Sequence, residues 1–372
     1  MSVRRWVRQG GAMECPREKA QRGRRPVLAC CCPGEPMNVR LVRDRHQQAI
    51  AAVAIEGLPS CALVGGSVAQ QNHMRLTAHV EAHVTETEQN KRVVRRVGGS
   101  CSPTGGRVSR RESDRTPISV ERLVEQLQSL GVVEGGVVQV HASFSAVGPV
   151  VGGPRGLIAA LLGAVGADGT IVMPSWPADA DAPFDPTRTD AAPDLGVVAQ
   201  EFWRQPGVRR TVHVQAFSAF GPAAEHILSD ALPLPPHIPE SPVGRVHQLS
   251  GQILLLGVDH DANTTIHLAE VMAGVPYGRP KSCTDVVDGH PLRIEYLEND
   301  HCCERFKLVG EWLAEAKAES RGKVGYAPSR LVLAADVVTA VVSRLERHPL
   351  LFLHGIGEGC TQCDEARASV TA

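Results

Sequence analysis

The sequence predicts an α/β fold, a three-layer sandwich in which helices flank a central mixed sheet. Two observations carry this prediction. Short apolar runs rich in β-branched residues alternate with amphipathic segments from about Pro117 onward, which is the pattern of a sheet covered by helices. No internal repeat interrupts that alternation.

Each element has its own local signal. Ser119 as N-cap and Gly131 as stop enclose apolar residues at a spacing of three to four, which predicts a helix between them. The run 169–173 is apolar and ends at Pro174, which predicts a buried strand. The other expected strands are 135–141, 252–257 and 291–296, and the other expected helices are 156–165, 195–204, 264–273, 303–316 and a long final helix 329–347.

Charge divides the chain into two unequal parts. Residues 1–115 hold 20 Lys+Arg and 10 Asp+Glu, whereas residues 116–372 hold 19 and 30. The first part mixes charges with Gly, Pro and Cys without a period, and its apolar run 47–64 has no evident pairing partner. We therefore predict that 1–115 is a disordered or wrongly assigned extension and that 116–372 is the functional domain. Its acidity either gives solubility or attracts a cationic ligand.

Targeting signals are absent from the sequence. No apolar run reaches the roughly 18 residues of a spanning helix, and the N-terminus lacks an apolar stretch with a cleavage site. The 11 cysteines, an odd number, argue against a secreted disulfide framework. The sequence thus predicts a cytoplasmic protein that does not bind membranes.

The polar segment after strand 252–257 is the strongest candidate for catalysis. His267 and Glu270 are three residues apart and share one face of the expected helix. A neighbouring carboxylate fixes the tautomer of an imidazole and raises its basicity, as a general base requires. Thr264 and Thr265 offer hydroxyls at the helix start, where an oxyanion could be stabilised. The alternative is an incidental packing pair.

A second candidate is the small-residue segment 141–154, between a strand and a helix. Small residues let backbone N–H groups approach a phosphate, and the following helix N-terminus favours an anion. The segment matches neither a Walker loop nor a dinucleotide fingerprint. An ordinary Gly-rich loop is therefore the alternative.

Longer stretches carry a family resemblance. The stretches are VVQVHASFSAVGPVVGG, GTIVMPSWPADADAPFDP, DLGVVAQEFWR, LPLPPHIPESPVGRVHQLSGQILLLGVDHDANTTIHLAE and EYLENDHCCERF. They resemble the aminoglycoside 3-N-acetyltransferase family, and within it the subclass that accepts apramycin and gentamicin. The resemblance covers about 116–372 and does not extend to 1–115.

The resemblance implies transfer of an acetyl group from the cosubstrate acetyl-CoA to the 3-amino group of a 2-deoxystreptamine aminoglycoside, which confers antibiotic resistance. Attack is direct, without an acyl-enzyme. The expected partners are these two small molecules and no nucleic acid, and the expected state is a monomer or homodimer.

The resemblance also assigns residues. His267 matches the catalytic histidine that deprotonates the amine, Glu270 orients it, and Thr265 contacts the tetrahedral intermediate. Asp179 and Asp181 flank Ala180, whereas close relatives carry adjacent acids slightly differently placed. The coenzyme contacts are Ser143, Phe144, Ser145, Ala146, Val147, Ser175 and Arg245, and the antibiotic contacts are Asp179, Asp181, His237 and Glu298, with His213 as a further pocket residue.

Cysteines suggest a structural metal site. Cys360 and Cys363 form a Cys-x-x-Cys pair, which is typical of tetrahedral zinc sites. Cys302 and Cys303 are adjacent, an unusual second half, and the resemblance implies that all four hold a structural zinc in a small C-terminal subdomain. Free or redox-active thiols are the alternative. Cys283 is expected in the core.

Two other classes of function remain open. Asp259, His260 and Asp261 could hold a hydrolytic metal, although consecutive residues do not easily point at one ion. A zinc ribbon with a basic arm could bind nucleic acid, although a ribbon needs two Cys-x-x-Cys knuckles and the acidic domain would repel phosphate. The resemblance favours the acetyltransferase.

Overall fold

The structure is a computed structural model that describes residues 37–43, 50–56, 115–229, 231–287 and 289–370. The chain divides into two units, Met1–Glu35 and Pro36–Ala372, and all described residues lie in the second. Most of the basic segment 1–115 thus lies outside the described residues. The domain boundary at 115 stays a prediction.

A mixed sheet of seven strands forms the centre of the second unit. Its middle strand β3 runs parallel to both neighbours, β4 and β7. The outer strands are antiparallel to the strands beside them. The order is β10 (Glu319–Val324), β11 (Ala327–Leu333), β7 (Gln252–Leu256), β3 (Val137–Ala142), β4 (Thr170–Pro174), β6 (Phe217–Phe220) and β5 (Arg209–Arg210).

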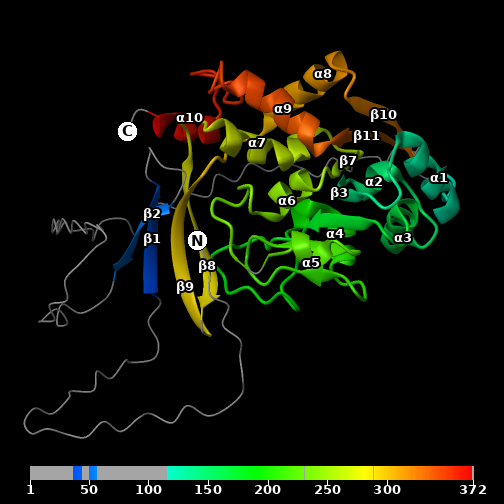
Figure 1. Cartoon of the computed structure of the whole chain (residues 1–372), viewed down its shortest axis with the longest axis horizontal. Coiled ribbons are helices and arrows are strands. Elements are labelled where there is room, and N and C mark those ends of the chain that lie inside the picture. The colour runs from blue at the N-terminus through cyan, green and yellow to red at the C-terminus, as the bar shows by residue number, and fades with distance from the viewer. Residues whose placement is uncertain (1–36, 44–49, 57–114, 230, 288, 371–372) are drawn as a thin grey trace, which may run out of the picture. The chain divides into compact units, whose positions relative to one another are not determined.

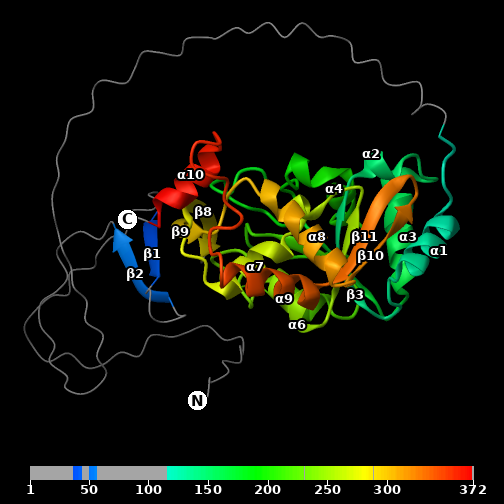
Figure 2. The same cartoon turned by 90° about the horizontal axis from the view of Figure 1, so that it is seen from above.

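Helices cover both faces of this sheet, as Figures 1 and 2 show. Because side chains alternate along a strand, Ile253 and Leu255 of β7 enter one apolar core and Leu254 and Leu256 enter the other. The first core contains residues of α5 (Ala224–Ile227), α6 (Pro242–Gln248), α7 (Thr265–Ala273), α8 (Leu308–Glu315) and α9 (Ala334–Leu345). The second contains residues of α1 (Val120–Leu130), α2 (Phe144–Val147), α3 (Gly153–Val165) and α4 (Gly196–Phe202). The predicted α/β sandwich is confirmed.

A second sheet of four strands was not expected from the sequence. Strands β8 (Arg279–Val287) and β9 (His290–Glu298) form an antiparallel hairpin. Strand β1 (Met37–Arg43) pairs parallel with β9, and β2 (Ile50–Glu56) pairs antiparallel with β1. The expectation that the apolar run 47–64 has no partner is therefore wrong. Its partner is a strand a few residues upstream, which the irregular composition of the segment concealed.

Local signals at helix ends were reliable. The Ser119 hydroxyl accepts a hydrogen bond from the Arg122 backbone N–H (3.2 Å), and Gly131 closes α1 in the left-handed conformation. The long final helix was wrong in its first turn, because residues 329–333 belong to β11 and hydrogen-bond to β7. The helix begins only at Ala334. The segment after β3, expected as a loop, forms the single helical turn α2.

The C-terminal helix α10 (Thr361–Ala368) packs into the main core through Cys363 and Ala366, which are fully buried. Short 3-10 turns precede α4, α7 and α8: η1 (Pro193–Leu195), η2 (His260–Ala262) and η3 (Glu304–Lys307). Cys283, on β8 of the hairpin, is buried, as predicted, in a small apolar cluster that also contains Phe184. Within the described ranges, no helix has the length and apolarity that crossing a bilayer requires.

Candidate active site

The His267–Glu270 pair predicted from the sequence forms on the first turns of α7. Glu270 Oε2 lies 2.7 Å from His267 Nδ1. The Glu270 side chain is fully buried, while 15% of the His267 side chain remains exposed. The other carboxylate oxygen of Glu270 accepts hydrogen bonds from the Tyr277 hydroxyl and from His301 Nε2 (2.9 Å). The carboxylate is thus fully engaged by three partners.

This arrangement determines which nitrogen of His267 can act as a base. A carboxylate at Nδ1 holds the proton there, so that Nε2 carries the lone pair. Burial would lower the pKa of His267, but the Cys303 sulfur and the Glu270 carboxylate raise it well above its usual value. Burial would raise the pKa of Glu270, yet hydrogen bonds from His267 and His301 hold it at about 2.

Aromatic rings enclose the His267 imidazole. His237 stacks on it with ring centroids 5.1 Å apart, and Phe306 meets it edge-on at 4.9 Å. Burial lowers the pKa of His237 well below its usual value, which favours the neutral form of this ring. The structure therefore brings His237, predicted as an antibiotic contact, directly against His267. His213, the other predicted pocket histidine, is buried and its Nε2 lies 3.1 Å from the Ser229 carbonyl oxygen.

A second polar group on β3 was missed from the sequence. Gln139 Nε2 donates to Thr264 Oγ1 (2.7 Å) and lies 3.0 Å from His141 Nε2. Gln139 and His141 are both buried, and burial lowers the pKa of His141 to about 4. The alternation of side chains along β3 could have revealed this pair. Because Val138 and Val140 face one core, Gln139 and His141 face the opposite side of the sheet, toward α7.

Thr265 lies at the start of α7, as predicted. Its backbone N–H donates to Asn263 Oδ1 (3.1 Å). Its side chain is fully buried, and Thr265 Oγ1 has no hydrogen-bond partner among the described residues. A buried hydroxyl without a partner is costly to maintain. The geometry leaves this donor free for a bound group.

The predicted coenzyme segment 143–147 lies against the end of β7. The Ser143 backbone N–H donates to the Leu256 carbonyl (2.8 Å). Gly257 has a φ of +66°, and a Cβ there would lie 2.4 Å from Ala146 Cβ. Glycine is needed at this position because α2 and the end of β7 approach so closely.

Two other predicted coenzyme contacts are engaged elsewhere. Ser175 is buried, and its hydroxyl is bonded to Ser218 Oγ (2.8 Å) and to Arg210 Nε (3.2 Å). Arg245 Nη1 donates to the His226 carbonyl (2.7 Å). None of these hydrogen bonds joins Ser175 or Arg245 to segment 143–147.

The predicted acidic residues differ in their surroundings. Glu298 lies close enough to His267 for the two charges to interact. The pKa of Glu298 is raised, mainly by burial and secondly by the negative charge of the nearby Asp300. Asp179 is exposed. Asp181 forms an ion pair with Arg293 (3.0 Å) and accepts from the Ser282 hydroxyl (3.1 Å). Asp179 Oδ1 accepts the Asp181 backbone N–H (3.0 Å), and among the described residues only Asp181 of these three acids forms an ion pair.

The cysteine site has a different fourth member from the one predicted. Cys302, Cys360 and Cys363 come together with His354, and their ligand atoms all lie within 4.8 Å of one another. Cys303 is not in this cluster: its φ of +59° turns the chain, and its Sγ lies 3.4 Å from His267 Nε2. Adjacent residues point in different directions, which is why Cys302 and Cys303 separate. His354 could not be predicted as a metal ligand, because it does not belong to a Cys-x-x-Cys pair or to another motif with ligand spacing.

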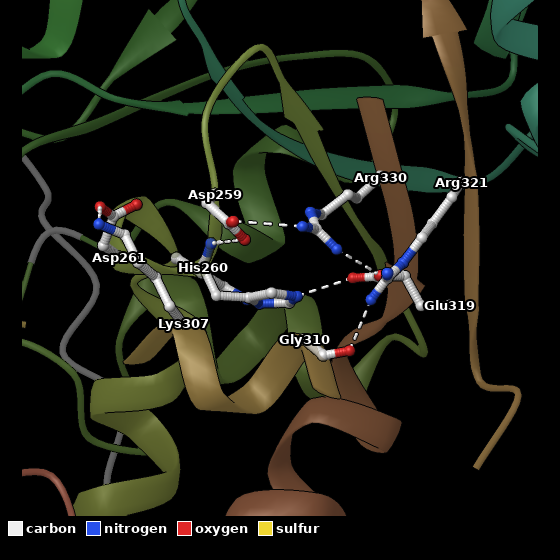
Figure 3. A network of polar contacts seen from close by, with 9 residues as sticks. Asp259, His260, Asp261, Lys307, Gly310, Glu319, Arg321 and Arg330 are labelled. Carbon is white, nitrogen blue, oxygen red and sulfur yellow. Dashed lines mark hydrogen bonds and ion pairs between the residues drawn. The ribbon is translucent and has the colours of Figure 1, made fainter. Parts of the chain in front are cut away.

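The alternative hydrolytic site does not assemble, as Figure 3 shows. Asp259 pairs with Arg330 (3.2 Å), His260 Nε2 lies 2.7 Å from Glu319 Oε1, and Asp261 pairs with Lys307 (3.0 Å). The three side chains thus point to three different partners. They form a polar network that holds the turn before α7, not a set of convergent ligands.

The fold and this site define an α/β protein in which a buried carboxylate orients a partly exposed histidine. A family model described as "Aminoglycoside 3-N-acetyltransferase" matches residues 139–346. The chain belongs to the aminoglycoside 3-N-acetyltransferase family, a family of acyltransferases.

Individual relatives agree with this assignment. An aminoglycoside N(3)-acetyltransferase IV of a Salmonella species is 57% identical over 232 residues, which cover 62% of this chain and 89% of the relative. An aminoglycoside N(3)-acetyltransferase VIII of Streptomyces fradiae is 34% identical over 264 residues, covering 62% and 92%.

Solved structures are similar as well. Aminoglycoside acetyltransferase AAC(3)-IVa as apoenzyme has a TM-score of 0.68 and 54% identity, covering 69% of this chain and 99% of that one. A histidine-to-alanine variant of it in complex with a gentamicin has a TM-score of 0.68 and 54% identity, covering 68% and 98%. AAC-IIIb with CoASH has a TM-score of 0.58 and 27% identity, covering 63% and 98%.

The network in Figure 3 generates a prediction about stability. The Glu319 side chain is fully buried; burial would raise its pKa, but hydrogen bonds from His260 and Arg321 hold it at about 2. Replacing Glu319 by Ala leaves buried partners unpaired, so the free energy of unfolding should fall by about 3–5 kcal/mol at neutral pH. Denaturant unfolding measures this loss.

The sign of the pH dependence provides a check. A carboxylate with a lowered pKa stabilises the fold above its unfolded-state pKa, and this contribution is lost as pH falls toward about 2. The difference between the wild type and Glu319→Ala should therefore shrink in acid. Glu315→Ala, at an exposed position nearby, serves as control. A constant difference at all pH values would contradict the assignment.

Proposed function

We propose that this protein transfers the acetyl group of acetyl-CoA to the 3-amino group of 2-deoxystreptamine aminoglycosides and thereby confers resistance, with His267 as general base. The observation that carries the proposal is an imidazole whose Nδ1 is held 2.7 Å from a fully buried carboxylate, which leaves the lone pair on Nε2. Residues 116–372 would carry this activity, and its location in the cytoplasm stays a prediction.

The chemistry follows from that pair. The acceptor amine attacks the thioester carbonyl carbon while its proton moves to His267 Nε2. Glu270 stabilises the imidazolium that forms, because a buried carboxylate at Nδ1 favours the charged ring. The tetrahedral intermediate then collapses, the C–S bond breaks, and the CoA thiolate takes up the proton. Cys303 Sγ lies 3.4 Å from Nε2, so the acceptor amine has to displace or share this contact.

The oxyanion of the intermediate needs a donor. We assign this role to Thr265, because its buried Oγ1 lacks a partner among the described residues and lies at the start of α7. Gln139 binds Thr264 Oγ1 and so positions the turn that presents Thr265. Gln139 and Thr264 would thus hold the Thr265 hydroxyl where the negative charge of the intermediate develops.

The coenzyme is assigned to the end of β3. Segment 143–147 presents a helical turn beside Gly257, at the carboxyl edge of two parallel strands, where α/β folds bind ligands. The similar AAC-IIIb structure holds CoASH, which supports CoA as the donor's carrier. Ser175 and Arg245 have other partners and are weaker candidates.

The acceptor is assigned to the acidic side of His267. Glu298, Asp179 and the neutral His237 ring would receive the ammonium groups of an aminoglycoside, since fixed carboxylates attract polycations. The similar AAC(3)-IVa variant is in complex with a gentamicin, which supports this class of acceptor. The engaged carboxylate of Asp181 would instead hold its loop in place.

Substitution of the pair gives a prediction with a defined sign. Because the pKa of His267 is raised, kcat/KM of the wild type should rise with pH through a value above 6.5. Glu270→Gln removes the carboxylate, which lowers that pKa, so the acid limb moves to lower pH. The maximal kcat should fall about 100-fold because the tautomer is no longer fixed.

The measurement is release of CoA thiol across pH, with Glu311→Gln at an exposed position as control. His267→Ala should abolish turnover while the protein still folds and binds acetyl-CoA. A His267→Ala variant with near-normal turnover would refute the general base.

Glu298 generates a prediction about the acceptor. Glu298→Gln should raise KM for gentamicin about tenfold with little change in kcat, since a fixed carboxylate binds the cation equally in ground and transition states. Glu295→Gln is a matched control, because Glu295 lies on the same strand with an exposed side chain. An unchanged KM in Glu298→Gln would remove this residue from the pocket.

We further propose that Cys302, His354, Cys360 and Cys363 bind a structural zinc. Three thiols and one imidazole form a donor set that zinc prefers. The set also has an outer partner, because His354 Nε2 lies 3.5 Å from Glu304 Oε2 while Nδ1 faces the sulfurs. A closed set of four leaves no position for substrate, so the metal would fasten α10 to the turn before α8.

This site predicts one equivalent of zinc in the purified protein. Cys363→Ser should lose the metal and lower the melting temperature, because metal binding contributes to folding. Cys283→Ser, at a buried cysteine outside the cluster, should keep the metal. Metal content by elemental analysis and thermal unfolding measure both effects, and a wild type without zinc would exclude the site.

A further inference from the structure

The segment 175–192, between β4 and η1, carries Asp179, one of the two acidic residues assigned to the acceptor, but contains no helix or strand. A segment of this length needs side-chain contacts to keep one conformation. Two of its residues bind the β8–β9 hairpin. The Ala180 carbonyl accepts a hydrogen bond from the Thr284 backbone N–H (2.8 Å), and Asp181 forms an ion pair with Arg293. At its two ends the Ala192 backbone N–H donates to the Trp176 carbonyl (2.8 Å), and one side chain contacts both ends as well.

That side chain is Arg210, on the short strand β5. Its Nη2 donates to the Ser175 carbonyl, and its Nη1 donates to the carbonyls of Thr189 (2.6 Å) and Pro186 (3.3 Å). Its Nε donates to Ser175 Oγ (3.2 Å). The guanidinium therefore joins the residue that begins the segment to residues near its end.

Two aromatic rings enclose the same guanidinium. Its Cζ lies 4.8 Å from the Phe184 ring, within the segment, and 4.4 Å from the Trp203 ring, at the end of α4. Burial and the nearby Arg204 lower the pKa of Arg210 to about 10. Among the described residues Arg210 forms no ion pair with a carboxylate. Its direct contacts are carbonyl oxygens, one hydroxyl and two ring faces, while Asp190 and Asp185 act on its charge from a longer distance.

We propose that Arg210 is a positioning residue for the acceptor: it fixes segment 175–192 so that Asp179 faces the polycationic substrate. The inference rests on the proposed function. The planar fork of an arginine serves several carbonyls while stacking between rings, whereas a lysine ammonium keeps the charge but cannot do both. The geometry of the guanidinium, beyond its charge, thus determines affinity for the acceptor.

The test compares Arg210→Lys with the wild type. KM for gentamicin and for apramycin should rise about tenfold, while KM for acetyl-CoA and kcat at saturation stay within about twofold, because the segment contacts the acceptor and not the reacting carbonyl. Arg209→Lys is the matched control: it lies next along β5, is exposed and pairs with Glu225 (3.0 Å), and it should leave every constant unchanged.

A second variant covers the case in which Arg210→Lys fails to fold. Phe184→Leu keeps an apolar side chain and removes one ring face from the guanidinium, so it should raise the same acceptor KM by a smaller factor. If the wild type acetylates gentamicin and both folded variants keep a normal acceptor KM, the inference is overturned and the proposed function stands. A fall in kcat with an unchanged acceptor KM would also overturn it. A wild type that neither binds nor acetylates either antibiotic would overturn both.

Discussion

The Glu270 carboxylate is the group on which the rest of the site depends. A buried anion is costly unless every oxygen is engaged, and here His267, Tyr277 and His301 engage it. These partners come from α7, from the turn that follows it and from the turn before η3. One carboxylate thus fixes the tautomer of His267 and at the same time joins three separate parts of the chain.

The three parallel strands explain why the candidate residues meet. Strands β4, β3 and β7 run in the same direction, so their carboxyl ends lie along one edge of the sheet. Segment 175–192 follows β4, segment 143–147 follows β3, and the turn to α7 follows β7. The assignments of acceptor, coenzyme and base to these segments place the reacting groups at neighbouring positions. The antiparallel strands outside this trio widen the sheet, and none of these three segments follows them.

Fixed polar networks surround the site on both sides. His260, Glu319 and Arg330 hold the turn before α7 (Figure 3). In segment 175–192, Arg210 performs a similar task with carbonyl groups. In both cases a charged side chain is buried among partners and acts on irregular backbone, because such backbone has no ladder of its own hydrogen bonds.

The sequence by itself determined the α/β class, most helix ends and the His267–Glu270 pair, because these features depend on local spacing and capping. It also determined the family through long matching stretches. Only the tertiary structure decided which distant groups complete each site. His354 replaced Cys303 in the cysteine cluster, since a left-handed turn separates Cys303 from Cys302. Strand pairing and packing give Gln139, His141 and Arg210 their contacts in the site. The contacts of Gln139 with Thr264 and of Arg210 with Thr189 join residues far apart in the chain, and no sequence spacing predicts them. Residues 329–333 became a strand because an adjacent strand offered hydrogen-bond partners, and partners across a sheet are decided by the whole fold.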